Sequence, residues 1–161
     1  KMILIVVVVV LIVNNFVLIN AKIPSESMEN TIMTGDRIFG NRLAYMFSDP
    51  QRYDIVIFKY PDDETQLYIK RVIGLPGETV EIREGKVYID GSDTPLDDSF
   101  TPETPLGNYG PYTVPEGCYF MLGDNRNYSK DSRFWQNPYV EKDKILGKAV
   151  FKYFPGFKIL K

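Results

Sequence analysis

Several residue types are scarce or missing in this 161-residue chain, and each gap excludes a class of protein. There is no histidine and one cysteine, so a zinc site of the usual His/Cys type is not expected. Cys118 cannot form an intrachain disulfide, and its apolar surroundings make it a core residue rather than a nucleophile. The net charge of −2 provides no basic field for nucleic acid. We therefore expect no metal, no cofactor and no nucleic-acid partner.

Charge is also missing from the start of the chain after Lys1. Residues 2–19 hold no charged side chain, and residues 2–13 are wholly apolar (MILIVVVVVLIV). Eighteen helical residues at ~1.5 Å each reach about 27 Å, enough for a thin hydrocarbon layer. We predict one N-terminal transmembrane helix, with a membrane anchor over 1–21 and a second domain over 22–161. Asn14-Asn15 and the lack of an Ala-x-Ala site argue against a cleaved signal peptide.

The rest of the chain favours β structure. Aromatic residues make up 14%, and 11 of them are tyrosine. Apolar runs bounded by turn signals predict strands, and they lie at 37–42, 53–60, 67–73, 79–83, 86–90, 118–122 and 144–154. Residues 91–115 predict a long irregular excursion, and the apolar residues 43–47 either pack normally or enter a lipid interface. The predicted fold class is all-β, mainly antiparallel, as a distorted barrel or packed sheets.

The strand predicted at 67–73 has an unusual basic pair. Both of its faces are apolar, so the neighbours Lys70 and Arg71 must point to opposite faces. Either one of them points inward, or both extend outward along an edge of the sheet. Arginine would stay charged inside, whereas a desolvated lysine can lose its proton and act as a general base. Because histidine is absent, such a lysine is a candidate base for a serine nucleophile.

Three polar segments follow the apolar start in a fixed order. They are residues 22–32 (KIPSESMENTI), 68–78 (YIKRVIGLPGE) and 123–133 (GDNRNYSKDSR). In this order they resemble the motifs of the bacterial type I signal peptidases over almost the whole chain. The resemblance implies an integral membrane serine endopeptidase that removes signal peptides from exported preproteins and uses a Ser–Lys dyad on an antiparallel β fold.

The resemblance also implies a role for each matching residue. Ser27 would be the nucleophile, Lys70 the general base, and Ser25 an oxyanion donor beside the Ser27 backbone N–H. Ser129 would orient the lysine, Asp131 and Arg133 would form a supporting ion pair, and Asp124 and Arg126 would shape the same loop. The residues lining the shallow substrate pockets would be Ile23, Met28, Tyr68 and Ile69. Asn30 departs from the family, which commonly has proline there.

The partners implied are preproteins with signal peptides, the lipid bilayer and, as a further candidate, the secretion machinery. Lys1 fits a cytoplasmic start under the positive-inside rule, which places a single-pass protein in the cell membrane with its catalytic domain on the extracytoplasmic face. Two alternatives stay open. One is a catalytically inactive, membrane-tethered module that binds signal peptides, and the other is a self-cleaving Ser–Lys protease like the SOS-response repressors.

Overall fold

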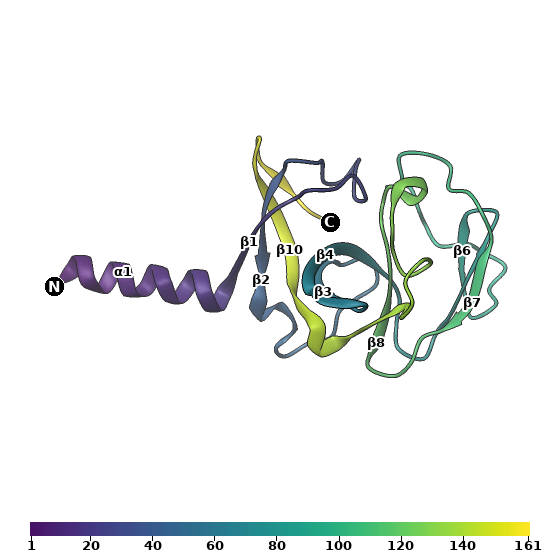
Figure 1. The fold of residues 1–161 in the computed structure, drawn as a ribbon, viewed down its shortest axis with the longest axis horizontal. Coiled ribbons are helices and arrows are strands. Elements are labelled where there is room, and N and C mark those ends of the chain that lie inside the picture. The colour runs from purple at the N-terminus through teal and green to yellow at the C-terminus, as the bar shows by residue number, and fades with distance from the viewer.

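The structure, a computed structural model, describes the backbone of residues 1–161 and the side chains of residues 1–8, 11 and 15–161. Two antiparallel sheets form the body of the molecule, and α1 (Met2–Ile12) extends away from it (Figure 1). The larger sheet has eight strands in the order β1-β2-β10-β3-β4-β8-β9, with β11 paired to β10. Its strands are β1 (Leu18–Lys22), β2 (Arg37–Asn41), β3 (Ile55–Tyr60), β4 (Asp63–Gly74), β8 (Cys118–Leu122), β9 (Tyr139–Glu141), β10 (Ile145–Phe154) and β11 (Lys158–Ile159). The predicted all-β, antiparallel class is confirmed.

The smaller sheet has the order β6-β5-β7 and lies at the end of the molecule opposite α1 (Figure 1). Its strands are β5 (Thr79–Arg83), β6 (Lys86–Ile89) and β7 (Tyr109–Thr113). The β5–β6 hairpin turns at Glu84 and Gly85, both at positive φ, between the strands predicted at 79–83 and 86–90. The excursion at 91–115 is not wholly irregular, because residues 109–113 form β7 and pair with β5. Gly110 and Pro111 within this strand hide it in the sequence.

The N-terminal segment differs from the prediction of one helix through residue 19. α1 ends at Ile12, a π-helical turn follows over Val13–Val17, and β1 begins at Leu18. The backbone N–H and C=O groups of β1 find hydrogen-bond partners in β2, with which β1 pairs from Leu18↔Asn41 to Lys22↔Arg37. Because of this pairing, the helical segment ends earlier than predicted. Within the described part of the chain, no helix has both the length and the apolar character needed to cross a bilayer.

Three apolar clusters fill the interior and hold the site in place. One contains Ile23, Met28 and Ile32 beneath the segment after β1, and a second surrounds Phe58 and Trp135. The third lies between the sheets and joins Phe120 of the larger sheet to Val80 of the smaller one. In the segment 43–47, the side chains of Leu43, Met46 and Phe47 are 40%, 60% and 94% exposed, so ordinary packing does not account for them.

Candidate active site

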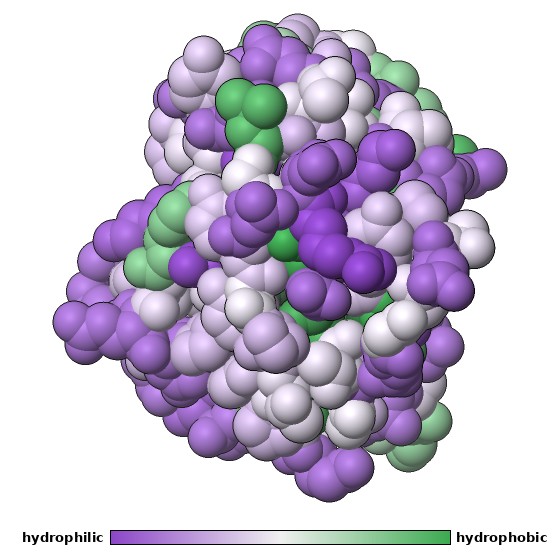
Figure 2. Space-filling model, turned by 90° about the vertical axis from the view of Figure 1, so that its right-hand side faces the viewer, coloured by the Kyte–Doolittle hydropathy of each residue, from purple (hydrophilic) through white to green (hydrophobic). Residues whose placement is uncertain are grey.

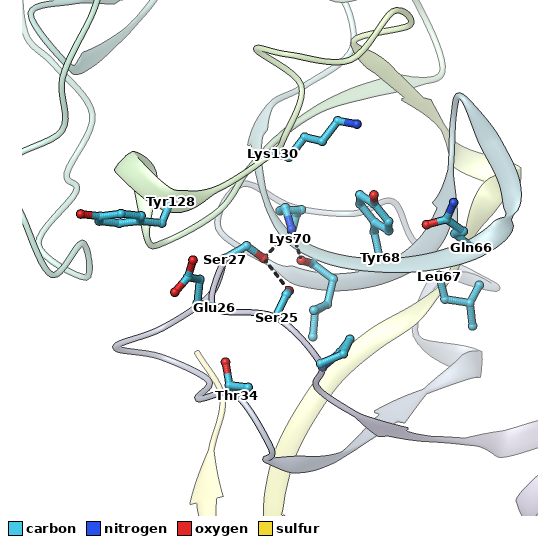
Figure 3. A pocket seen from close by; sticks show the side chains of 12 residues that line it. Ser25, Glu26, Ser27, Thr34, Gln66, Leu67, Tyr68, Lys70, Tyr128 and Lys130 are labelled. Carbon is cyan, nitrogen blue, oxygen red and sulfur yellow. Dashed lines mark hydrogen bonds between the residues drawn. The ribbon is translucent and has the colours of Figure 1, made fainter.

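Strand β4 brings its basic pair inside the protein. Lys70 is 3% exposed and Arg71 is 2% exposed, on opposite faces of the strand. The sequence left open whether one of the two points inward or both extend outward, and instead both are buried because the second half of β4 is covered on both faces. The Lys70 ammonium donates to Ser27 Oγ at 2.6 Å and to the Ile69 carbonyl at 3.1 Å (Figure 3). The two residues are therefore in contact across 43 positions of sequence.

The protonation of Lys70 is shifted by its surroundings. Burial lowers the pKa of the Lys70 ammonium from 10.5 to about 8, because the charged form loses its hydration. The carboxylates of Asp131 and Asp124 oppose this shift but do not cancel it. A measurable fraction of Lys70 is consequently neutral near physiological pH, and a neutral amine can accept the proton of the hydroxyl it contacts.

Ser27 lies at the start of a tight turn whose apolar side chains are buried in the core. Met28 and Ile32 are fully buried, and the Ile32 N–H donates to the Met28 carbonyl at 2.8 Å. Asn30 has a φ of 80°, which asparagine tolerates and the ring of proline does not permit, so this turn requires the departure from the family residue. Ser25 Oγ lies 3.4 Å from Ser27 Oγ, on the side where Figure 3 shows the cleft.

The loop 123–133 supports the turn through buried polar groups. Arg133 donates to both carboxylate oxygens of Asp131 at 2.8 and 2.9 Å, and Asp131 accepts from the Gly123 N–H at 3.0 Å. Gly123 packs directly against Ser27 and Ser129. A Cβ at this position would lie 2.2 Å from Ser129 Oγ and 2.4 Å from the Ser27 carbonyl oxygen, so only glycine fits here. Ser129 Oγ is buried without a hydrogen-bond partner among the described residues, so the bond to Lys70 that the resemblance implies is not formed.

Two ion pairs of this loop, one fully buried and one partly buried, were not predicted as pairs. Asp124 is fully buried and accepts from Arg71 at 2.8 and 2.6 Å, and it also accepts from Thr31 Oγ1 at 2.5 Å. Arg126 donates to both oxygens of Asp98 at 2.9 and 2.6 Å. The sequence showed a loop rich in charges of both signs, but it held no signal for their partners on β4 and in the excursion.

An open cleft of ≈ 580 Å³ lies in front of Ser27 and Lys70 (Figure 3). Tyr68 and Ile69 line this cleft, whereas Ile23 and Met28 lie in the apolar cluster beneath and do not reach it. Those two residues are 3% and 0% exposed because the turn needs them as its anchors. The lining residues that the sequence did not indicate are Pro24, Glu26, Thr34, Gln66, Leu67, Tyr128 and Lys130.

The arrangement can perform nucleophilic acyl transfer. It has a hydroxyl, a buried amine within hydrogen-bond reach and an adjacent cleft, which together are the requirements for an activated serine. Among the described residues, no group of three or more His, Cys, Asp or Glu side chains is placed to hold a metal ion.

Comparison with known proteins identifies the family of the chain. The family described as signal peptidase, peptidase S26, matches residues 1–154. The probable signal peptidase I-2 of Synechocystis sp. is 39% identical over 149 residues, which cover 89% of this chain and 66% of that protein. The signal peptidase I of Bacillus amyloliquefaciens is 34% identical, and the match covers 100% of this chain and 89% of that protein.

A solved structure has a similar fold. The crystal structure of a signal peptidase I from Enterococcus faecalis V583 superposes with a TM-score of 0.53 at 36% sequence identity, covering 63% of this chain and 97% of that one. The fold and these relatives define a serine endopeptidase. The chain belongs to the signal peptidase family, peptidase S26.

Proposed function

We propose that this protein cleaves signal peptides from exported preproteins, with Ser27 as nucleophile and Lys70 as general base. The observation that carries the proposal is the 2.6 Å contact between the Ser27 hydroxyl and a buried lysine of lowered pKa. The family that the chain matches, and its relatives, are also signal peptidases.

The mechanism follows from this contact. Neutral Lys70 accepts the Ser27 proton while Ser27 Oγ attacks the carbonyl carbon of the scissile peptide bond. The developing oxyanion is stabilised by the Ser25 hydroxyl and the Ser27 backbone N–H, and one such donor contributes about 3 kcal/mol. The C–N bond then breaks, and Lys70 gives its proton to the departing amine. A water molecule, deprotonated by Lys70, hydrolyses the acyl ester and restores Ser27.

The substrate would bind as an additional strand beside β4. On the side away from β3, β4 pairs with β8 from Arg71 onward, and among the described residues no strand pairs there with the backbone from Gln66 to Lys70. An extended peptide can pair with this edge, next to the cleft that Tyr68 and Ile69 line. Pockets this shallow would accept small side chains and exclude bulky ones by volume.

Support for Ser27 would come from Asp131, Arg133, Asp124, Arg126 and Ser129.

The N-terminal segment 1–21 would tether the protein to a membrane through the residues before β1, since β1 itself pairs with β2, and would leave the catalytic domain, 22–161, on the extracytoplasmic face. The apolar side chains from Met2 to Val8 are 46% to 81% exposed, an unfavourable arrangement in water. Phe16, Met46 and Phe47 are also exposed, at 68%, 60% and 94%. The face of the molecule that lies opposite α1 is predominantly hydrophilic (Figure 2). Lipid contact is therefore favoured on the α1 side. The secretion machinery remains a candidate partner.

The test is cleavage of a preprotein carrying an Ala-x-Ala site by the detergent-solubilised full chain, with the cut located by mass spectrometry. Ser27→Ala and Lys70→Ala are compared with Ser92→Ala and Lys86→Ala, which change an exposed serine and an exposed lysine outside the cleft. We expect cleavage after the second alanine in the wild type and both controls, and none in the two site variants.

The other outcomes are informative in different ways. Cleavage that survives in Lys70→Ala would discard lysine as the base while keeping the nucleophile. A folded wild type that binds the preprotein without cutting it would favour the binding-module alternative. A cut within the chain itself, with the preprotein intact, would favour the self-cleaving alternative.

A further inference from the structure

The excursion at 91–115, to which the sequence analysis assigned no function, contacts the site through residues 98–100, here called the strap. The strap reaches three segments that meet around the Ser27–Lys70 contact. These are the turn after Ser27, strand β4 and the loop 123–133. None of the strap residues lines the cleft.

The aromatic ring of Phe100 covers charged groups on two of these segments. The guanidinium carbon of Arg71 lies 4.2 Å from the ring centroid, and that of Arg126 lies 5.9 Å away. Such cation–π contacts are strongest when the cation has lost its water, and both arginines are nearly fully buried. Arg71 directly follows Lys70 in β4, so fixing its guanidinium also fixes the backbone that carries the lysine.

A main-chain carbonyl and a carboxylate of the strap also bind it to the turn after Ser27 and to the loop 123–133. Asn30 Nδ2 donates to the Phe100 carbonyl at 2.7 Å, which fastens the turn that begins at Ser27. Asp98 accepts two hydrogen bonds from Arg126, whose Nε donates at 3.1 Å to the carbonyl of Gly123. Gly123 in turn lies against the Ser27 carbonyl.

These contacts matter because Ser27 and Lys70 lie on separate segments, 43 positions apart in the chain. Their hydrogen bond depends on how a loop turn and a strand are placed relative to each other. A displacement of about 1 Å in a reacting group can lower a rate about 10²-fold. A single element that contacts the turn after Ser27, strand β4 and the loop 123–133 would keep the distance between Ser27 Oγ and the Lys70 amine short.

We propose that Phe100 is a positioning residue that, together with Asp98, keeps Ser27 and Lys70 within reach of each other. The inference rests on the proposed function, since its kinetic effect is read in signal-peptide cleavage. It gives the excursion a role in the rate of the chemical step rather than in substrate binding.

The experiment compares Phe100→Leu and Phe100→Tyr in the detergent-solubilised full chain, with Tyr88→Leu as matched control. Tyr88 is likewise half-buried, and the Arg83 guanidinium carbon lies 3.8 Å from its ring centroid, in the β5–β6 hairpin. We expect Phe100→Leu to lower kcat about tenfold with KM changed less than about twofold. Phe100→Tyr should restore most of kcat, because it keeps the ring, and Tyr88→Leu should match the wild type.

A second readout does not depend on activity. Amide hydrogen exchange in the turn at 28–32 should become faster in Phe100→Leu and stay at the wild-type rate in Phe100→Tyr and Tyr88→Leu. If Phe100→Leu does not fold, Asp98→Asn takes its place, with kcat expected to fall about threefold through a weaker pair with Arg126.

Unchanged kcat and unchanged exchange in the strap variants would overturn the inference. So would an equal loss in Tyr88→Leu, or a loss that Phe100→Tyr does not restore, because either would indicate general packing. If the wild type does not cleave, the proposed function fails by itself, and the exchange comparison still decides whether the strap holds the turn.

Discussion

At the scale of single residues, the decisive property is the proton on Lys70. Its pKa of about 8 means that the neutral base is the minor form below that pH. We predict that kcat/KM rises about tenfold per pH unit at acidic pH and levels off above about 8. The measurement is the pH–rate profile of preprotein cleavage from pH 5 to 10. A profile that is flat across this range, with chemistry rate-limiting, would contradict lysine as the base.

The same pKa shift predicts a pH-dependent stability. The folded pKa of about 8 lies below the unfolded value of 10.5, so folding is opposed by the buried charge below pH 8. Between 8 and 10.5 the unfolded chain binds more protons, and the free energy of unfolding rises with pH. Lys70→Met should therefore stabilise the fold at pH 7 by on the order of 2 kcal/mol, and this gain should disappear by pH 10.5. Urea unfolding at both pH values is the check, and a gain independent of pH would contradict it.

At the scale of elements, the association of β4 with the loop 123–133 depends on the buried Arg71–Asp124 pair. Asp124→Ala would leave the Arg71 guanidinium buried without its carboxylate, and we expect a loss of about 3–5 kcal/mol in the free energy of unfolding. Glu64→Ala is the matched control, because Glu64 is 47% exposed and its pair with Lys144 at 2.7 Å should contribute less than about 1 kcal/mol. Equal losses in the two variants, measured by urea unfolding, would show that burial of the pair is not what matters.

At the scale of the whole molecule, the prediction concerns lipid. Leu4→Asp places a charge on the exposed apolar surface of α1, and we expect binding to phospholipid vesicles to weaken about tenfold or more. Leu106→Asp is the control, because Leu106 in the excursion is 67% exposed and Leu4 is 68% exposed. Co-sedimentation with vesicles is the measurement. Equal effects of the two changes would argue against a tether formed by the N-terminal segment.

Much of the fold could be predicted because its signals are local. The runs at 53–60, 67–73, 118–122 and 144–154 correspond to β3, β4, β8 and β10, since alternation and turn residues act over a few positions. The strands missed were β1, β7, β9 and β11, which are short or interrupted by Pro, Gly or Asn. The helix was predicted too long because β1 is specified by its pairing with β2 and not by its own composition.

What the sequence by itself determined was the chemistry on offer. Without histidine, an inward lysine among apolar strand positions was a candidate base, and the resemblance of the three motifs implied Ser27 and Lys70 as the dyad. Only the tertiary structure decided that both Lys70 and Arg71 are buried, that Ser129 makes no bond to the lysine, and that the 98–100 strap contacts the site. Distances between segments 43 to 90 residues apart depend on how sheets and loops pack, and no local pattern in a sequence encodes that packing.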